Sequence, residues 1–246
     1  MIAKRARFDL LLGSDIGLWI VERVDPADAA AVVTRSDEIA AAARERGLAV
    51  RATVATGDGD NRRTGPGYAL SAHWPAVLGS NELGLYEQAW NIHPGLLPWG
   101  RGYGPVFWAL WAGEPAGASL HIMTVGLDRG PVVDQRPVDV RDDDTAADLY
   151  GRVLEARKEL FSEWWPRLTA GERPAGRPQV SGGSYHDRAA FLALRDAPPL
   201  TDMSGVDLVR LCRALAMPGM PGPVVSQGRR LALDSASEPQ AHPEQS

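Results

Sequence analysis

The sequence has little cysteine and no long hydrophobic run. Cys212 is the only cysteine among 246 residues, which excludes an internal disulfide and a metal site built from cysteines. The apolar runs fall far short of the roughly 20 residues that a membrane-spanning helix needs. Basic residues near the start precede only Leu10–Leu12, so we expect a first strand rather than a signal peptide. These absences make a cytoplasmic location, without a membrane partner, the default expectation.

The sequence also lacks an excess of positive charge. Its formal net charge is −5, from 26 basic and 31 acidic residues. We expect no nucleic-acid partner, because binding along a phosphate backbone needs a basic surface. The content of 44% hydrophobic and 23% charged residues is typical of a globular protein and excludes collagen, coiled coils and wholesale disorder. The length allows one main domain with an appendage.

Strands and helices are predicted to alternate along the first 170 residues. Short apolar runs bounded by turns indicate strands, and longer amphipathic stretches indicate helices. This alternation is typical of an α/β fold with a Rossmann-like, mostly parallel sheet. The expected strands are 8–12, 31–34, 48–54, 68–71, 89–93 and 118–124. The expected helices are 14–24, 37–46, 106–112 and 146–168.

A change in character after Gly171 predicts the appendage. Prolines and glycines first indicate a linker, and Ser204 with Asp207 forms a capping-box pattern that predicts a helix up to Met217. A β-hairpin is expected around Gly228. The predicted parts are a main domain at 1–170, an appendage at 171–234 and a disordered tail at 235–246. The polar, glycine-rich residues 55–67 are interpreted as a mobile loop.

The residues that could carry chemistry gather between 91 and 128. Asn91 and His93 are two apart on a predicted strand, so their side chains project to one face where Pro94-Gly95 ends the strand. Ligands bind at the carboxyl ends of strands in such sheets. An Asn amide can stabilise a developing oxyanion and a His can move the proton of an attacking amine, as acyl transfer requires. Asp128, in a later glycine-bounded loop, is expected to orient His93 and stabilise its imidazolium.

A purely structural role for these three residues is the alternative. Asn91 would then cap a turn, His93 would be a hydrogen-bonded, half-buried histidine, and Asp128 would form an Asx turn. The residue types alone favour neither interpretation.

The segment from Asn91 through Gln135 resembles the catalytic region of the folate-dependent formyltransferases. That family includes glycinamide ribonucleotide, methionyl-tRNA and nucleotide-sugar formyltransferases. The matching motifs, in the family's order, are Asn91-x-His93-Pro94-Gly95-x-Leu97-Pro98, Arg101-Gly102, Gly117-Ala118-Ser119-x-His121 and Gly126-x-Asp128-x-Gly130-Pro131-x-Val133-x-Gln135. The resemblance covers most of the chain between residues 10 and 233.

The resemblance implies N10-formyltetrahydrofolate as the formyl donor, no metal, and a catalytic trio of Asn91, His93 and Asp128. It also implies a loop whose backbone meets the pterin ring of the folate, with His73 incidental beside it. The residues that the resemblance assigns to folate binding are Trp74, Pro75, Ala76, Val77, Leu78 and Asp128.

Within the family, the sequence looks closest to the nucleotide-sugar branch. Many members have Ser where Gly95 stands, and the Pro-Gly form, the residues 98–103 and the Ser184-Tyr185-His186 motif are similar to that branch. A methionyl-tRNA enzyme would be expected to add a barrel domain and a basic surface. A glycinamide ribonucleotide enzyme would leave the residues after 171 unexplained.

The implied function is formyl transfer to the primary amine of a nucleotide-linked amino sugar. Two alternatives stay open. The acceptor would be another small amine, of the glycinamide ribonucleotide, aminoglycoside or hydroxyornithine type, or the protein would be a non-catalytic folate- or nucleotide-binding module. A homodimer formed through the C-terminal helix and hairpin is implied by the resemblance alone.

Four of the eight tryptophans fall between residues 90 and 111. Trp99 and Tyr103 are expected to stack on a nucleotide base or line a sugar pocket, whereas Trp108 and Trp111 are expected in the core. Arg101 would contact an anion of the substrate or, equally, order its own loop.

Two further groups invite a functional interpretation and are better explained structurally. His121 is expected to be a packed, hydrogen-bonded histidine rather than part of the folate cleft. The acidic triplet 142–144 precedes Thr145 and a helix, so capping and the helix dipole explain it without a metal.

Overall fold

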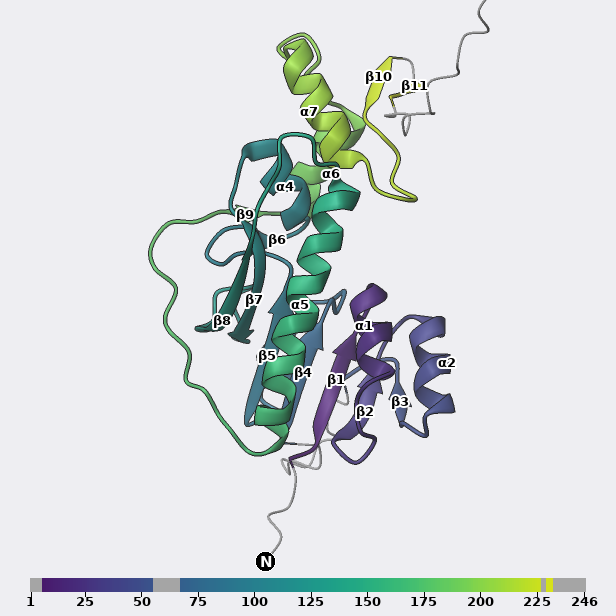
Figure 1. Ribbon diagram of the computed structural model, residues 1–246, viewed down its shortest axis with the longest axis vertical. Helices are drawn as coiled ribbons and strands as arrows, with labels where there is room; N and C mark the ends of the chain where they lie inside the picture. The colour runs from purple at the N-terminus through teal and green to yellow at the C-terminus, as the bar shows by residue number, and fades with distance from the viewer. Residues whose placement is uncertain (1–5, 55–66, 227–228, 232–246) are drawn as a thin grey trace, which may run out of the picture.

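The computed structural model describes residues 6–54, 67–226 and 229–231. Its main sheet has the strand order β3-β2-β1-β4-β5-β7-β8 (Figure 1). The strands are β1 (Phe8–Leu12), β2 (Ala29–Val33), β3 (Val50–Arg51), β4 (Tyr68–Ala72), β5 (Gln88–His93), β7 (Ala116–Ile122) and β8 (Val132–Val138). The strands from β3 to β5 are parallel, whereas β7 is antiparallel to both of its neighbours. The predicted α/β fold with a mostly parallel sheet is therefore confirmed.

Seven helices lie in the described part of the chain. They are α1 (Ser14–Val21), α2 (Asp37–Glu45), α3 (Ser80–Leu83), α4 (Pro105–Ala112), α5 (Ala146–Thr169), α6 (Arg188–Asp196) and α7 (Gly205–Leu215). The long helix α5 runs along the sheet (Figure 1). None of the helices among the described residues is long and apolar enough to cross a lipid bilayer.

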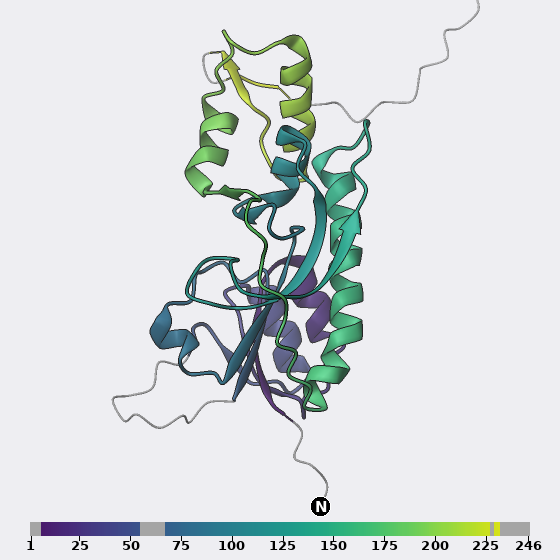
Figure 2. The same cartoon turned by 90° about the vertical axis from the view of Figure 1, so that its left-hand side faces the viewer.

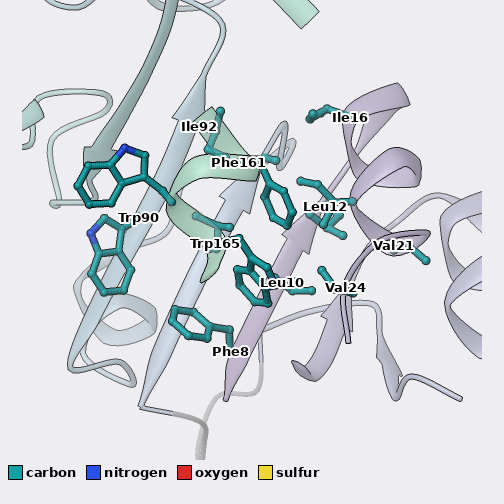
Figure 3. Close-up of a cluster of buried hydrophobic side chains, with 14 of the residues drawn as sticks. Phe8, Leu10, Leu12, Ile16, Val21, Val24, Trp90, Ile92, Phe161 and Trp165 are labelled. Carbon is teal, nitrogen blue, oxygen red and sulfur yellow. The ribbon is translucent and has the colours of Figure 1, made fainter. Parts of the chain in front are cut away.

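The central strand β1 explains why the sheet is covered on both faces. Phe8, Leu10 and Leu12 point into a cluster with side chains of α1 and α5 (Figure 3). Leu11 belongs to a second cluster on the opposite face. A run that is apolar at every position except Asp9, which pairs with Arg51, is typical of a strand that is buried on both sides of a parallel sheet. The ring centroids of Phe8 and Trp165 are 5.1 Å apart, so the two aromatic side chains pack the strand against helix α5.

Capping interactions set the start of α5. The Thr145 hydroxyl accepts a hydrogen bond from the Asp148 backbone N–H, and the Asp148 carboxylate in return accepts one from the Thr145 N–H. Asp144 is buried, accepts a hydrogen bond from the Arg141 N–H and pairs with Arg152. The acidic triplet is thus engaged, through Asp144, in the turn that enters the helix.

The helices α6 and α7 pack on one end of the main domain (Figure 2). Phe191 of α6 and Leu211 and Leu215 of α7 share a buried cluster with Phe107 of α4 and Leu149 of α5. The predicted capping box at the start of α7 and the predicted hairpin, formed by β10 (Val224–Ser226) and β11 (Arg229–Arg230), are both confirmed. The appendage therefore completes a core to which the main domain contributes most of the buried residues.

One connection brings the appendage to the middle of the molecule. After α5 the chain runs back along the sheet to β9 (Tyr185–His186), which pairs in parallel with β6 (Arg101–Gly102) (Figure 1). Two short strands from segments about eighty residues apart in sequence thus lie side by side.

Several predicted boundaries differ from the structure. The third strand covers only Val50–Arg51, and α1 ends at Val21. Neither β8 nor α6 was predicted, because β8 is an edge strand with polar residues and Pro137, and α6 buries little besides Phe191. The predicted loop at 55–67, apart from Gly67, and the predicted tail lie outside the described residues.

Truncation of Leu10 should destabilise the fold strongly. Leu10 is fully buried in the cluster between the sheet and α5, so L10A leaves a cavity and should lower the free energy of unfolding by about 2–5 kcal/mol. Urea denaturation measures this change. The matched control is V206A on α7, where the side chain is 69% exposed and a change within about 0.5 kcal/mol is expected. Equal losses in the two variants would contradict this assignment of the core.

Candidate active site

The pairing of β5 with β7 assembles the candidate site. In the antiparallel register Asn91 lies opposite His121, and His93 lies opposite Ser119. The loop after β7 brings Asp128 back toward the same strand end. The structure therefore brings together the three residues predicted to be catalytic and adds His121, which was predicted to be only structural.

Asn91 and His121 are in direct contact. The Asn91 Nδ2 and His121 Nε2 atoms are 3.2 Å apart, while His121 Nδ1 lies 3.0 Å from the backbone carbonyl of Ile122. A carbonyl only accepts, so Nδ1 donates to Ile122 and Nε2 is the atom that contacts the Asn91 amide. The same Nε2 atom also lies 3.5 Å from Asp128 Oδ1. This contact engages one of the two amide hydrogens of Asn91 and fixes which way the amide points.

The orientation of His93 is set by a backbone carbonyl. His93 Nε2 lies 2.8 Å from the Gly100 carbonyl oxygen, so Nε2 donates and carries the proton in the neutral ring. Nδ1 is then the free basic nitrogen. It lies 3.6 Å from Asp128 Oδ2, which is too long for a hydrogen bond but close enough for strong attraction once the ring is protonated.

Burial and charge leave both groups of this pair deprotonated at neutral pH. Burial lowers the pKa of His93 below its ordinary value, although the Asp128 carboxylate opposes this effect. Burial alone would raise the pKa of Asp128, but His93, His121 and the Gly102 N–H together hold it well below its usual range. The site thus presents a neutral imidazole beside a carboxylate, which is the arrangement of a general base whose conjugate acid is stabilised.

Backbone and amide groups hold Asp128 in place. Its φ angle is +53°, and the Gln179 side chain donates to its carbonyl oxygen at 2.7 Å. The Gly102 N–H donates to Oδ2 at 3.0 Å. Asp tolerates this left-handed conformation better than most residues. The carboxylate is therefore fixed by groups from two other segments of the chain.

Gly95 makes room for the observed orientation of His93. A Cβ atom at this position would lie 2.7 Å from His93 Nε2 and 3.0 Å from the Gly100 carbonyl oxygen. Any larger residue would therefore press on the hydrogen bond between His93 and Gly100. The need for space beside His93 explains sterically why glycine follows Pro94 in this motif.

Ser119 and Gln135 brace the loop that follows His93. The Ser119 hydroxyl donates to the Gly95 carbonyl at 2.7 Å and accepts from the Leu97 N–H at 3.0 Å. The Gln135 amide donates to the Leu97 carbonyl at 2.8 Å and to the Ser119 hydroxyl at 2.9 Å. Both residues stand in the motifs quoted above, but their bracing role depends on strand pairing that the sequence does not display.

A buried arginine behind the site was not predicted. Arg157 of α5 is fully buried and donates from Nη2 to the carbonyl of Ile92, the residue between Asn91 and His93, at 3.3 Å. Burial lowers its pKa to about 10. The only signal in the sequence is its position on the apolar stripe of α5, between Val153 and Leu160.

The residues predicted to bind ligands lie around this centre. Trp74–Leu78 follow β4, the neighbour of β5, and within them Val77 is exposed and Leu78 is buried. Trp99 and Tyr103 flank Gly100–Gly102 and are 39% and 40% exposed, whereas Trp108 is buried and Trp111 packs on the same cluster. These exposed rings remain available to a ligand.

Arg101 orders its own loop. Its Nε and Nη2 atoms donate to the backbone carbonyls of Ser184 and Gly182 at 3.0 and 3.3 Å. Of the two roles weighed for Arg101, the structure contains the loop-ordering one. Among the described residues, no group of three His, Cys, Asp or Glu side chains is arranged to hold a metal ion.

Comparison with known proteins identifies a family. A family model described as Formyl transferase matches residues 39–164. Methionyl-tRNA formyltransferase from Rhodococcus erythropolis is 34% identical over 183 residues, which cover 67% of this chain and 60% of that protein. The chain thus matches less than two thirds of the length of this relative.

Solved structures share the fold at low sequence identity. A 4-N formyltransferase from Francisella tularensis superposes with a TM-score of 0.76 at 18% identity, covering 95% of this chain and 99% of that one. An N-formyltransferase from Helicobacter canadensis, solved with folinic acid and dTDP-3-aminofucose, has a TM-score of 0.69 at 16% identity, covering 86% and 81%.

Removal of the Asp128 charge should lower the pKa of His93 further. The carboxylate is the main group that favours the imidazolium against burial, so D128N should shift the His93 titration to lower pH. NMR titration of the imidazole Cε1–H measures the shift. D37N, at an exposed position in the first turn of α2, is the control and should leave the titration unchanged. A His93 pKa that stays constant or rises in D128N would show that the two groups are not coupled.

Proposed function

Because this chain belongs to the formyl transferase family, we propose that it moves a formyl group from N10-formyltetrahydrofolate to the primary amine of a nucleotide-linked amino sugar. The observation that carries the proposal is the arrangement of Asn91, His93 and Asp128 at the end of β5. A donor, a neutral base and a buried carboxylate are the groups that formyl transfer to an amine requires.

Each member of the trio has a separate role in the proposed reaction. As the neutral amine attacks the formyl carbon, the second amide hydrogen of Asn91 donates to the oxygen that gains negative charge. His93 Nδ1 accepts the proton of the attacking nitrogen and delivers it to the departing folate nitrogen. Asp128 stabilises the imidazolium in between, because its carboxylate lies 3.6 Å from Nδ1. The products are the formamide and tetrahydrofolate.

The segment Trp74–Leu78 is the proposed contact surface for the donor, together with Asp128. It lies at the carboxyl end of β4, next to the strand that carries Asn91 and His93. The buried indole N–H of Trp74 has no hydrogen-bond partner among the described residues, so the segment retains an unused donor. Both features suit a ring system that is rich in hydrogen-bonding groups.

The exposed rings of Trp99 and Tyr103 support a nucleotide-linked acceptor. Aromatic faces beside the catalytic trio are suited to stack on a base or on the apolar face of a sugar. The Helicobacter canadensis structure holds a nucleotide-linked amino sugar and a folate together on the same fold. The formal net charge of −5 makes methionyl-tRNA, the substrate named for the Rhodococcus relative, the weaker candidate.

Turnover with a panel of amines tests the activity directly. Purified protein with N10-formyltetrahydrofolate should formylate one or more nucleotide-linked amino sugars, detected by mass spectrometry and by release of tetrahydrofolate. Methionyl-tRNA, glycinamide ribonucleotide, an aminoglycoside and hydroxyornithine are the competing acceptors. Preference for one of these would contradict the proposed acceptor class and identify the preferred amine as the acceptor instead. Folate binding without turnover on any amine would favour a non-catalytic binding module.

Loss of the proposed base, His93, should lower activity more than loss of the proposed oxyanion donor, Asn91. H93A should abolish transfer, because His93 Nδ1 is the proposed base and the Asn91 amide occupies His121 Nε2, the other ring nitrogen near Asp128. N91A should lower kcat by about a hundredfold or more, as expected for one oxyanion donor. Steady-state assays measure both, with thermal unfolding to verify folding and S181A as the unaltered control. Near-normal turnover in H93A would eliminate the proposed mechanism.

Trp99 should affect the acceptor and not the donor. If its exposed ring stacks on the acceptor, W99A removes about 1–3 kcal/mol of stacking and should raise the acceptor KM by about fivefold or more. The donor KM should stay within twofold. An increase in the donor KM alone would move Trp99 to the folate side of the site.

A further inference from the structure

The loop that orients His93 is itself held by residues 182–186 of the appendage. The Gly100 N–H donates to the Ser184 hydroxyl at 2.8 Å, and the Ser184 N–H donates to the Pro98 carbonyl at 3.1 Å. Further along, the Tyr103 N–H donates to the His186 carbonyl at 2.8 Å. The appendage therefore contacts the loop on both sides of Gly100, the residue whose carbonyl holds His93.

A close approach of two backbones makes this contact rigid. A Cβ atom on Gly183 would lie 2.1 Å from the Pro98 carbonyl oxygen, and one on Gly102 would lie 2.2 Å from the His186 carbonyl oxygen. The φ angles of Gly183 and Gly102 are +75° and +88°, in the range that favours glycine. Side chains at either position would separate the loop from the appendage.

The Glu114 carboxylate accepts hydrogen bonds from two residues of the appendage segment, Ser184 and His186. The Ser184 hydroxyl donates to Glu114 Oε2 at 2.7 Å, and His186 Nε2 donates to Oε1 at 2.7 Å. The His186 ring stacks on Trp108 at a centroid distance of 3.8 Å, and the Trp108 indole N–H donates to the Tyr103 carbonyl at 3.0 Å. The carboxylate side chain is only 9% exposed, so these hydrogen bonds are shielded from water.

This cluster is not a second catalytic triad, although it contains Ser, His and Glu. The Ser184 hydroxyl is bonded to Glu114 and to a backbone N–H, and His186 is bonded to Glu114 rather than to Ser184. His186 is therefore not positioned to activate the hydroxyl, as the base of a triad would be. The hydrogen bonds lead instead from Glu114 through Ser184 to Gly100.

We propose that Glu114, Ser184 and His186 are positioning residues for His93: by fixing Gly100, they select the tautomer and ring orientation in which Nδ1 faces Asp128. The chain of contacts is continuous from Glu114 to the His93 ring. The inference depends on the proposed function for its effect on rate, but its effect on the His93 ring is independent of any substrate. The appendage is then part of the catalytic machinery and not only a substrate-binding addition.

Substitution of Ser184 tests the proposal through the His93 ring. In S184A the Gly100 N–H loses its acceptor, so the share of neutral His93 protonated at Nε2 should fall, as measured by 15N NMR of histidine-labelled protein with H93Q for assignment. S184T keeps the hydroxyl and should restore the wild-type spectrum. S181A removes an exposed serine next to the same segment and should change nothing.

The rate supplies the second measurement. With an active acceptor, S184A should lower kcat by about ten- to a hundredfold, as for a small displacement of a catalytic group, and leave both KM values within twofold. If the proposed function fails and no amine is formylated, the NMR comparison still decides the proposal. A His93 spectrum in S184A identical to that of the wild type would overturn the proposal. A folded S184T protein whose His93 spectrum differs from that of the wild type would overturn it as well.

A second variant covers the case in which S184A does not fold. E114Q keeps the shape of Glu114, but the amide nitrogen cannot accept a hydrogen bond, so either Ser184 or His186 loses its acceptor. The expected result is a partial change in the His93 tautomer and a smaller loss of kcat than in S184A. An unchanged ring and rate in folded E114Q would exclude Glu114 from the positioning chain.

Discussion

One hydrogen bond, from His93 Nε2 to the Gly100 carbonyl, determines how the candidate active site is arranged. An imidazole has one basic nitrogen when neutral, and the partner of the other nitrogen decides which one it is. Here the Gly100 carbonyl accepts the hydrogen bond of the protonated nitrogen, Nε2, so the basic nitrogen, Nδ1, faces Asp128. The surrounding constraints serve the same contact: Gly95 leaves space for it, and Ser119 and Gln135 hold the loop that supplies it. An alternative loop conformation would change the chemistry without changing a catalytic residue.

Burial makes this arrangement effective. His93 and Asp128 are almost entirely excluded from water, where an attraction between charges is much stronger than at a surface. The same burial opposes protonation of His93, whereas the Asp128 carboxylate favours it. Arg157 adds a fully buried positive charge behind Ile92, which also disfavours the imidazolium. The His93 ring is therefore neutral at rest, as its proposed role as a base requires.

The sequence predicts the parts of this site better than their connections. Asn91 and His93 were identified because a strand has a period of two residues, and β1 because a short, mostly apolar run is typical of a buried parallel strand. His121 was interpreted as structural, since its contact with Asn91 depends on an antiparallel register between strands thirty residues apart. Strand β8 was missed because its edge position tolerates polar residues and Pro137. Local periodicity is visible in one sequence, whereas register and hydrogen-bond partners across the fold are not.

The same reasoning explains why the appendage looked separable and is not. Its prolines and glycines indicate a linker, and one of those glycines, Gly183, instead allows close backbone contact with the loop after His93, where Gly102 does the same from the other side. Glycine is typical of flexible linkers, but at positive φ it is also the residue that lets two backbone segments approach this closely. The buried cluster shared by α4, α5, α6 and α7 fixes the appendage at one end, and the β6–β9 pairing fixes it at the catalytic end. Motion of the appendage would have to break one of these two attachments, so the proposed positioning of His93 also depends on the packing of the distant helices.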